Sequence, residues 1–215
     1  MKLRTTLPLA ALAGFTLSAN AASISISTTA PIVGTLDVAN LAAGTATQKW
    51  FDDVEHDAGQ TFTPTVGGLL KRWTIHLSGG NENDAANENV DLRFGTISRP
   101  GGVFTFTDVY VENAAQSTDW LANDYVTFTF DTPQAVTAGV EYGIITDAQS
   151  MGAWQSGIPY RHRTGNLYAG GSLINRGGES AGSDLVFHAE IIPEPSTVLL
   201  GMAGALGFLV RRRRA

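Results

Sequence analysis

Apolar side chains occupy every second position in several segments through the middle of the chain. This period of two is typical of β-strands with one buried face, and no segment there shows the 3.6-residue spacing of an amphipathic helix. The alternating apolar positions are Leu69, Trp73, Ile75 and Leu77, with Lys71 as an exception; Val90, Leu92 and Phe94; Val126, Phe128 and Phe130; Val140, Tyr142 and Ile144; and Leu185, Phe187, Ala189 and Ile191. Glycine- and proline-rich turns separate these segments, which predicts an all-β, antiparallel β-sandwich over residues 22–192.

Three short segments resemble sequences that are common in jelly-roll modules of exported bacterial proteins, some of which bind carbohydrate. They are Gly59-Gln60-Thr61-Phe62-Thr63-Pro64, residues 136–142 and residues 184–187. The resemblance implies a jelly-roll-like sandwich and assigns no ligand.

Charge is distributed unevenly along the 215 residues, whose formal net charge is -6. Lys2, Arg4 and residues 211–214 hold six of the 14 basic residues, so the chain between them has a net charge of about -12. Such a body would repel phosphate backbones, and we expect no nucleic-acid partner. The chain contains no cysteine, which excludes disulfides, thiol nucleophiles and thiolate metal sites.

The N-terminal residues have the three regions of a secretory signal peptide. Lys2 and Arg4 precede an apolar run at residues 7–17, and Ala19-Asn20-Ala21 places small residues where a signal peptidase reads them. We therefore expect residues 1–21 to be the signal peptide, cleaved after Ala21, with signal peptidase as a partner in export. A short buried helix is the alternative.

The C-terminal residues form a second three-part pattern. Pro193-Glu194-Pro195 cannot continue a strand or a helix, residues 198–210 carry no charge, and Arg211, Arg212, Arg213 and Arg214 follow. Thirteen helical residues span roughly 20 Å, short of the roughly 30 Å hydrocarbon core of a bilayer. We predict a short transmembrane helix with its arginines on the cytoplasmic side. Such a helix is either part of a sorting signal or an ordinary single-span anchor.

This order of Pro-Glu-Pro, short apolar helix and terminal arginines resembles the PEP-CTERM sorting signal of Gram-negative bacteria. The resemblance covers residues 193–215 and implies recognition by the intramembrane enzyme exosortase. It further implies a location in the cell envelope, at the cell surface or outside the cell after processing, and an association with extracellular polysaccharide.

Aromatic residues outside the apolar faces are candidates for carbohydrate binding, because sugar C–H faces stack on rings. The candidates are Trp120, Tyr125, Trp154, Tyr160 and Tyr168. We expect the binding loop to be residues 151–182, which are rich in glycine, serine and aromatic residues. Aromatic residues that cover the ends of the sandwich for structural reasons are the alternative.

Two acidic segments are candidates for a structural calcium site, since Ca²⁺ takes six to eight oxygen ligands. The candidate ligands are Asp52, Asp53, Asp84 and Asp91. Neither segment has EF-hand spacing, and hydrated polar loops are the alternative. No other cofactor is expected.

No catalytic motif is present. The four histidines form no His-Glu-x-x-His pair, there is no Gly-x-Ser-x-Gly elbow, and the strand pattern places His76 and His188 on solvated faces. We therefore expect a non-catalytic surface or matrix protein. A secreted glycan-degrading hydrolase on the same scaffold is the alternative, because two carboxylates can flank a sugar bond without a sequence signature.

Overall fold

A computed structural model describes residues 21–42, 46–49, 58–79, 89–115, 120–147, 159–175 and 177–194. Within these residues the structure is all-β, with a single 3₁₀ turn, η1 (Pro100–Gly102), as the exception. The strands are β1 (Ala21–Ser27), β2 (Val38–Asn40), β3 (Ala46–Lys49), β4 (Ala58–Phe62), β5 (Gly68–His76), β6 (Asn89–Ser98), β7 (Thr105–Ala115), β8 (Tyr125–Val136), β9 (Tyr142–Asp147), β10 (Pro159–Thr164), β11 (Leu173–Asn175), β12 (Gly178–Ser180), β13 (Ser183–Leu185) and β14 (Phe187–Ile192). The predicted all-β class is confirmed.

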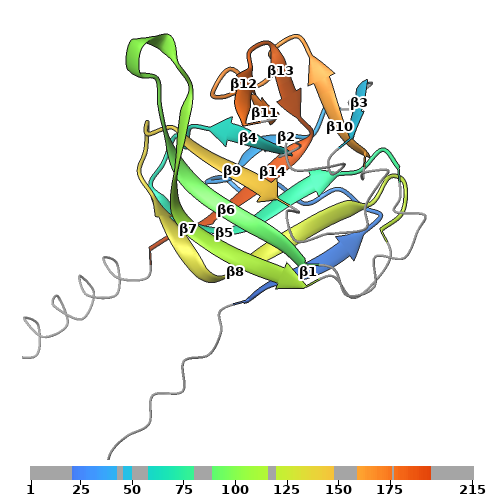
Figure 1. The fold of residues 1–215 in the computed structure, drawn as a ribbon. Coiled ribbons are helices and arrows are strands. Elements are labelled where there is room, and N and C mark those ends of the chain that lie inside the picture. The colour runs from blue at the N-terminus through green and yellow to red at the C-terminus, as the bar shows by residue number, and fades with distance from the viewer. Residues whose placement is uncertain are drawn as a thin grey trace, which may run out of the picture.

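The strands form one sheet of eleven and one of three. The large sheet has the order β12-β11-β4-β9-β6-β7-β1-β8-β5-β14-β2, and the small one the order β13-β10-β3. Strand β1 pairs in parallel with β7 through Ala21 and Ala22, then antiparallel with β8 from Ser23 to Ser27. The large sheet is therefore mixed and continuous through β1, so the predicted two-sheet, purely antiparallel, jelly-roll-like sandwich is not confirmed (Figure 1).

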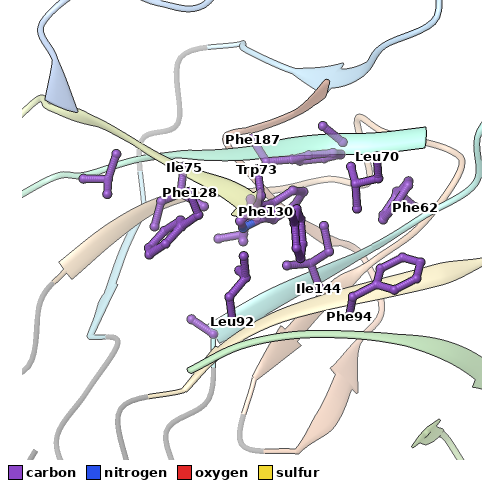
Figure 2. Packing of buried hydrophobic residues seen from close by; sticks show 14 of the residues in the cluster. Phe62, Leu70, Trp73, Ile75, Leu92, Phe94, Phe128, Phe130, Ile144 and Phe187 are labelled. Atoms are coloured by element: carbon purple, nitrogen blue, oxygen red, sulfur yellow. The ribbon is translucent and has the colours of Figure 1, made fainter. Parts of the chain in front are cut away.

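The large sheet curls so that strands far apart in its order pack against each other. Phe62 of β4 lies 6.5 Å from Trp73 of β5, although β4 and β5 are on opposite sides of β1 in the sheet order, and Trp73 lies 5.1 Å from Phe187 of the adjacent strand β14, measured between ring centroids. Figure 2 shows these rings gathered with Leu70 and Ile144 between the strands. All five side chains are at most 1 % exposed, and full burial of each contributes about 1.5–3 kcal/mol, so this cluster is the core that fixes the curl.

The exception at Lys71 in the alternating pattern is a β-bulge. Against β14, Leu70 pairs with Ile191 and Arg72 with Glu190, so Lys71 is one extra residue on β5. The buried face therefore changes phase, and Leu70 is fully buried where the pattern predicts Leu69. That part of the predicted pattern was wrong because a bulge moves the inward positions by one residue.

Both targeting predictions fall almost entirely outside the described residues. Residues 1–20, the predicted signal peptide apart from its last residue, and the segment from Pro195 onward, with the predicted membrane helix and Arg211 to Arg214, lie there. Within the described part of the chain, no helix has the length and apolar character needed to cross a membrane.

Candidate functional site

The last strand of the body leads directly into the predicted sorting tail. Strand β14 lies between β5 and β2 in the sheet, and it buries Phe187, Ala189 and Ile191 in the core. It ends at Ile192, and Pro193 and Glu194 follow as exposed residues. A proline has no N–H to donate to a strand ladder, so the sheet ends where the Pro-Glu-Pro sequence begins.

The carboxylate of Asp37 anchors this last strand to the segment at residues 28–37. It accepts hydrogen bonds from the backbone N–H of Ile191 at 2.9 Å and of Gly34 at 2.6 Å, and it lies 2.8 Å from Nε2 of His188. The two side chains are 5 % and 4 % exposed. Burial alone would raise the pKa of Asp37, but these hydrogen bonds outweigh it and hold the pKa below its usual value. Asp37 is therefore an ionised anchor beneath the tail.

A groove of about 900 Å³ runs along the outer face of the sheet to the point where the tail leaves; we call it the tail groove. Its floor comes from β1, β8, β5 and β14, and one side comes from residues 31–37, with Pro193 at the end. Ile32, 94 % exposed, and Pro31 supply an apolar rim.

Polar side chains cross the floor of the tail groove in two rows set by the strand register. The first row is Ser25, Thr127, Thr74 and His188, and the second is Ser23, Thr129, Arg72 and Glu190. In the first row the hydroxyls of Thr74 and Thr127 are hydrogen-bonded at 2.8 Å. In the second row Arg72 donates to Glu190 at 2.9 Å. The floor thus offers hydroxyl donors and acceptors beside one ion pair.

A second polar hollow, of about 270 Å³, surrounds Arg99 in the turn of the β6–β7 hairpin. The guanidinium of Arg99 donates to both oxygens of Glu141 at 2.6 and 2.8 Å, and to both oxygens of Glu179 at 2.8 and 2.9 Å. The hydrogen bonds from Arg99 lower the pKa of Glu141 and of Glu179. Both glutamates are therefore ionised at neutral pH.

The four aromatic candidates that the structure describes do not form a common surface. Trp120 and Tyr160 are 0 % and 1 % exposed and belong to the core, so their ring faces cannot stack on a sugar. Those two predictions were wrong because Trp120, ahead of β8, and Tyr160, on β10, both turn inward. Trp154 lies outside the described residues.

The two remaining aromatic candidates are half-buried and lie against other side chains. The ring of Tyr125 stacks on His76 at 4.2 Å. Tyr168 packs edge-on against Phe187 at 5.3 Å, and its hydroxyl accepts a hydrogen bond from the N–H of Thr63 at 3.0 Å. Tyr168 thereby fixes its loop to the end of β4.

The calcium prediction concerns mostly residues outside the described part. Asp52, Asp53 and Asp84 lie there, and Asp91 lies on β6, where it accepts a hydrogen bond from the amide of Asn113 at 3.0 Å. Among the described residues, no group of three histidine or carboxylate side chains is placed to hold a metal ion. Calcium binding stays a prediction.

The histidines are more enclosed than the strand pattern predicts. His188 is 3 % exposed instead of solvated, because residues 31–37 cover this part of the sheet. His76 is half-buried, and burial, together with the charge of Arg161, lowers its pKa. Part of the polar face of β14 is therefore buried beneath residues 31–37. The alternating pattern of β14 alone cannot predict this burial.

Comparison with protein families identifies the tail. Residues 192–214 match the family described as the PEP-CTERM protein-sorting motif. The chain carries a PEP-CTERM sorting motif, and the resemblance stated from the sequence is confirmed. This motif indicates an exported protein of the cell envelope or surface that is sorted by an exosortase.

Comparison of the whole chain adds no assignment for the body. No curated protein matches it. One similar solved structure holds the cysteine protease and lectin-like domains of Cwp84, a surface layer associated protein of Clostridium difficile, with 8 % identity and a TM-score of 0.37. The match covers 62 % of this chain and 31 % of that one, so the chain spans less than a third of its length.

Proposed function

We propose that this chain is a non-catalytic surface protein of a Gram-negative bacterium whose body associates with extracellular polysaccharide after an exosortase has processed its tail. The observation that carries the proposal is the position of the sorting motif, which begins at the last residue of β14 beside the tail groove. Residues 198–210 would then hold the precursor in the membrane as a short helix, with Arg211 to Arg214 on the cytoplasmic side.

The lining of the tail groove supports a polysaccharide ligand. Sugar hydroxyls need hydrogen-bond partners of both kinds, and the rows through Thr74, Thr127 and Thr129 supply them across neighbouring strands. Pro31 and Ile32 provide aliphatic contact for the C–H faces of a sugar. An open groove along a sheet suits an extended chain better than a single small molecule.

The pKa directions at Arg99 argue against one carboxylate pair that the hydrolase alternative could use. A glycosidase needs one carboxylic acid that stays protonated, which requires a raised pKa. Glu141 and Glu179 instead have lowered pKa values because they share one guanidinium. This pair therefore lacks the general acid that the hydrolase alternative requires.

Mass spectrometry of the mature protein from its native host tests the sorting step. We expect a C-terminus upstream of Arg211, with the apolar segment missing. A mature surface form that still ends in the arginine cluster would contradict processing.

Binding of the purified protein to exopolysaccharide from the same host tests the ligand. The double variant Thr127→Val and Thr129→Val removes two groove hydroxyls, and we expect it to weaken binding about tenfold or more. Thr107→Val, the same change on the exposed face of β7, is the matched control and should bind like the original protein. Shortened sugars released from the polysaccharide would instead support the hydrolase alternative, and equal binding by all variants would exclude the groove.

A further inference from the structure

A buried carboxylate without a counter-ion lies beside the first strand of the body. Glu112 of β7 is 2 % exposed, and its oxygens accept hydrogen bonds from the backbone N–H of Asp131 at 2.9 and 3.3 Å. Among the described residues no cation pairs with it, and the carboxylate of Asp131 adds a second negative charge nearby. A buried carboxylate is costly unless a positive group compensates it.

The strand register places the start of β1 next to this carboxylate. Ala21 pairs with Asn113 and Ala22 with Ala114, in parallel. The side chains of Ala22 and Ala114 both belong to the core, so they share the inner face of the sheet. Glu112 precedes Ala114 by two residues on that same face, about 7 Å along the strand, on the side where the nitrogen of Ala22 lies.

Strand β8 bounds the same place from the other side. Its pairing with β1 ends at Thr129, opposite Ser23, and Asp131 lies two residues further along. The N–H of Asp131 donates its hydrogen bond to Glu112 instead of to a backbone carbonyl of β1. The carboxylate of Glu112 thus lies between β7 and β8 at the level where β1 begins.

Cleavage at the predicted site would deliver a cation to this position. Hydrolysis of the bond between Ala21 and Ala22 consumes one water, leaves a carboxylate on Ala21 and frees an α-amine on Ala22, which is protonated at neutral pH. We propose that Glu112 is the acceptor site for the α-ammonium group of Ala22, and that their ion pair fixes β1 between β7 and β8 only after the signal peptide has been removed.

Without this ammonium group, the surroundings of Glu112 favour its protonated form. Burial raises the pKa of Glu112, and the charge of Asp131 raises it further, against the hydrogen bond from the Asp131 N–H. A neighbouring ammonium would reverse this direction.

The test uses the chain from Ala22 to Ala215 in detergent micelles, carrying an N-terminal tag that a protease removes without leaving residues. We expect the melting temperature to rise by about 5 °C or more when the tag is removed, because a buried charge becomes paired. We also expect the pKa of the Ala22 α-amine, measured by NMR, to lie a unit or more above its usual value of about 8.

The variant Glu112→Gln separates this ion pair from other effects of tag removal. With the tag in place, Glu112→Gln should melt at the same temperature as the original chain or at a higher one. After the tag is removed, Glu112→Gln should melt at a lower temperature than the original chain. Glu179→Gln, which breaks an exposed pair at Arg99, is the control and should shift both forms equally. Acetylation of Ala22 in the unmodified chain removes the positive charge without altering Glu112, and should reproduce the tagged form.

Three results would each overturn the proposal. They are a melting temperature that tag removal does not change, an α-amine that titrates at its usual pKa, and a native mature protein whose first residue is more than one position from Ala22. None of these depends on whether the C-terminal tail is processed.

Discussion

The Asp37 anchor gives the sharpest prediction about stability. In Asp37→Asn the side chain keeps its shape but loses its charge and one acceptor oxygen. At least one of the three hydrogen bonds to Gly34, Ile191 and His188 is then lost, and an amide N–H group is forced against a backbone N–H or the imidazole. Hydrogen bonds to a charged group contribute about 1.5–3 kcal/mol each, and breaking a buried pair costs about 3–5 kcal/mol. We expect the free energy of unfolding to fall by about 3 kcal/mol.

Urea denaturation of the original chain and of Asp37→Asn measures this loss. Hydrogen exchange should locate it, with faster exchange of the Ile191 and Gly34 amides. The matched control is Glu190→Gln on the same face of β14, whose partner Arg72 has a side chain 44 % exposed. Because solvent screens that pair, its removal should cost less than about 1 kcal/mol.

The stability difference between the original chain and Asp37→Asn should depend on pH in one direction. The pKa of Asp37 is lowered from 3.8 on folding, so its contribution to stability is complete above about pH 4 and is lost as the pH falls through the folded value. Asparagine does not titrate, so the difference between the two proteins should shrink below pH 4. A difference under 1 kcal/mol at pH 7, or one that stays constant down to pH 2, would refute an ionised anchor.

Three further variants test other parts of the fold. Gly171→Ala should cost more than about 2 kcal/mol in urea denaturation, because a Cβ there would clash with the carbonyl oxygen of Thr61, and a loss below about 0.5 kcal/mol would mean that the loop shifts freely. Trp73→Ala should cost about 3–5 kcal/mol and broaden the NMR signals of the core, whereas a native-like spectrum would show that the curled sheet does not need this ring. Arg99→Lys should change the stability by less than about 1 kcal/mol, since the Arg99 side chain is 37 % exposed; a larger loss by thermal denaturation would show that the bidentate geometry matters more than solvent screening allows.

Local pattern was enough to predict strands β5, β6, β8, β9 and β14 and the C-terminal sorting motif. The alternation through Val90, Leu92 and Phe94 places all three in the core, and the run at Val126, Phe128 and Phe130 does the same. The PEP-CTERM motif was recognisable because its parts are adjacent in the sequence. Features carried by spacing within one segment were therefore accessible without a structure.

Features that need two distant segments were not accessible. His188 was predicted to be solvated because apolar and polar residues alternate along β14. Its partner Asp37 lies 151 residues away, and no local sequence signal indicates their contact. The hydroxyl rows of the tail groove likewise depend on which strands are neighbours and in which register. Trp120 shows the converse error, since a residue at the margin of the alternating pattern turns inward to fill the core.

Both ends of the body are interior strands whose partners come from far along the chain. Strand β1 pairs with residues about a hundred positions later, and β14 pairs with β5 more than a hundred positions earlier. Closing loops of this size costs conformational entropy before the stabilising contacts form. Because the partner strands are so far apart in the chain, the sheet cannot be completed until nearly the whole body has been synthesised. Late completion of the sheet would suit an exported protein, because a chain that is still unfolded can cross a membrane through a narrow channel.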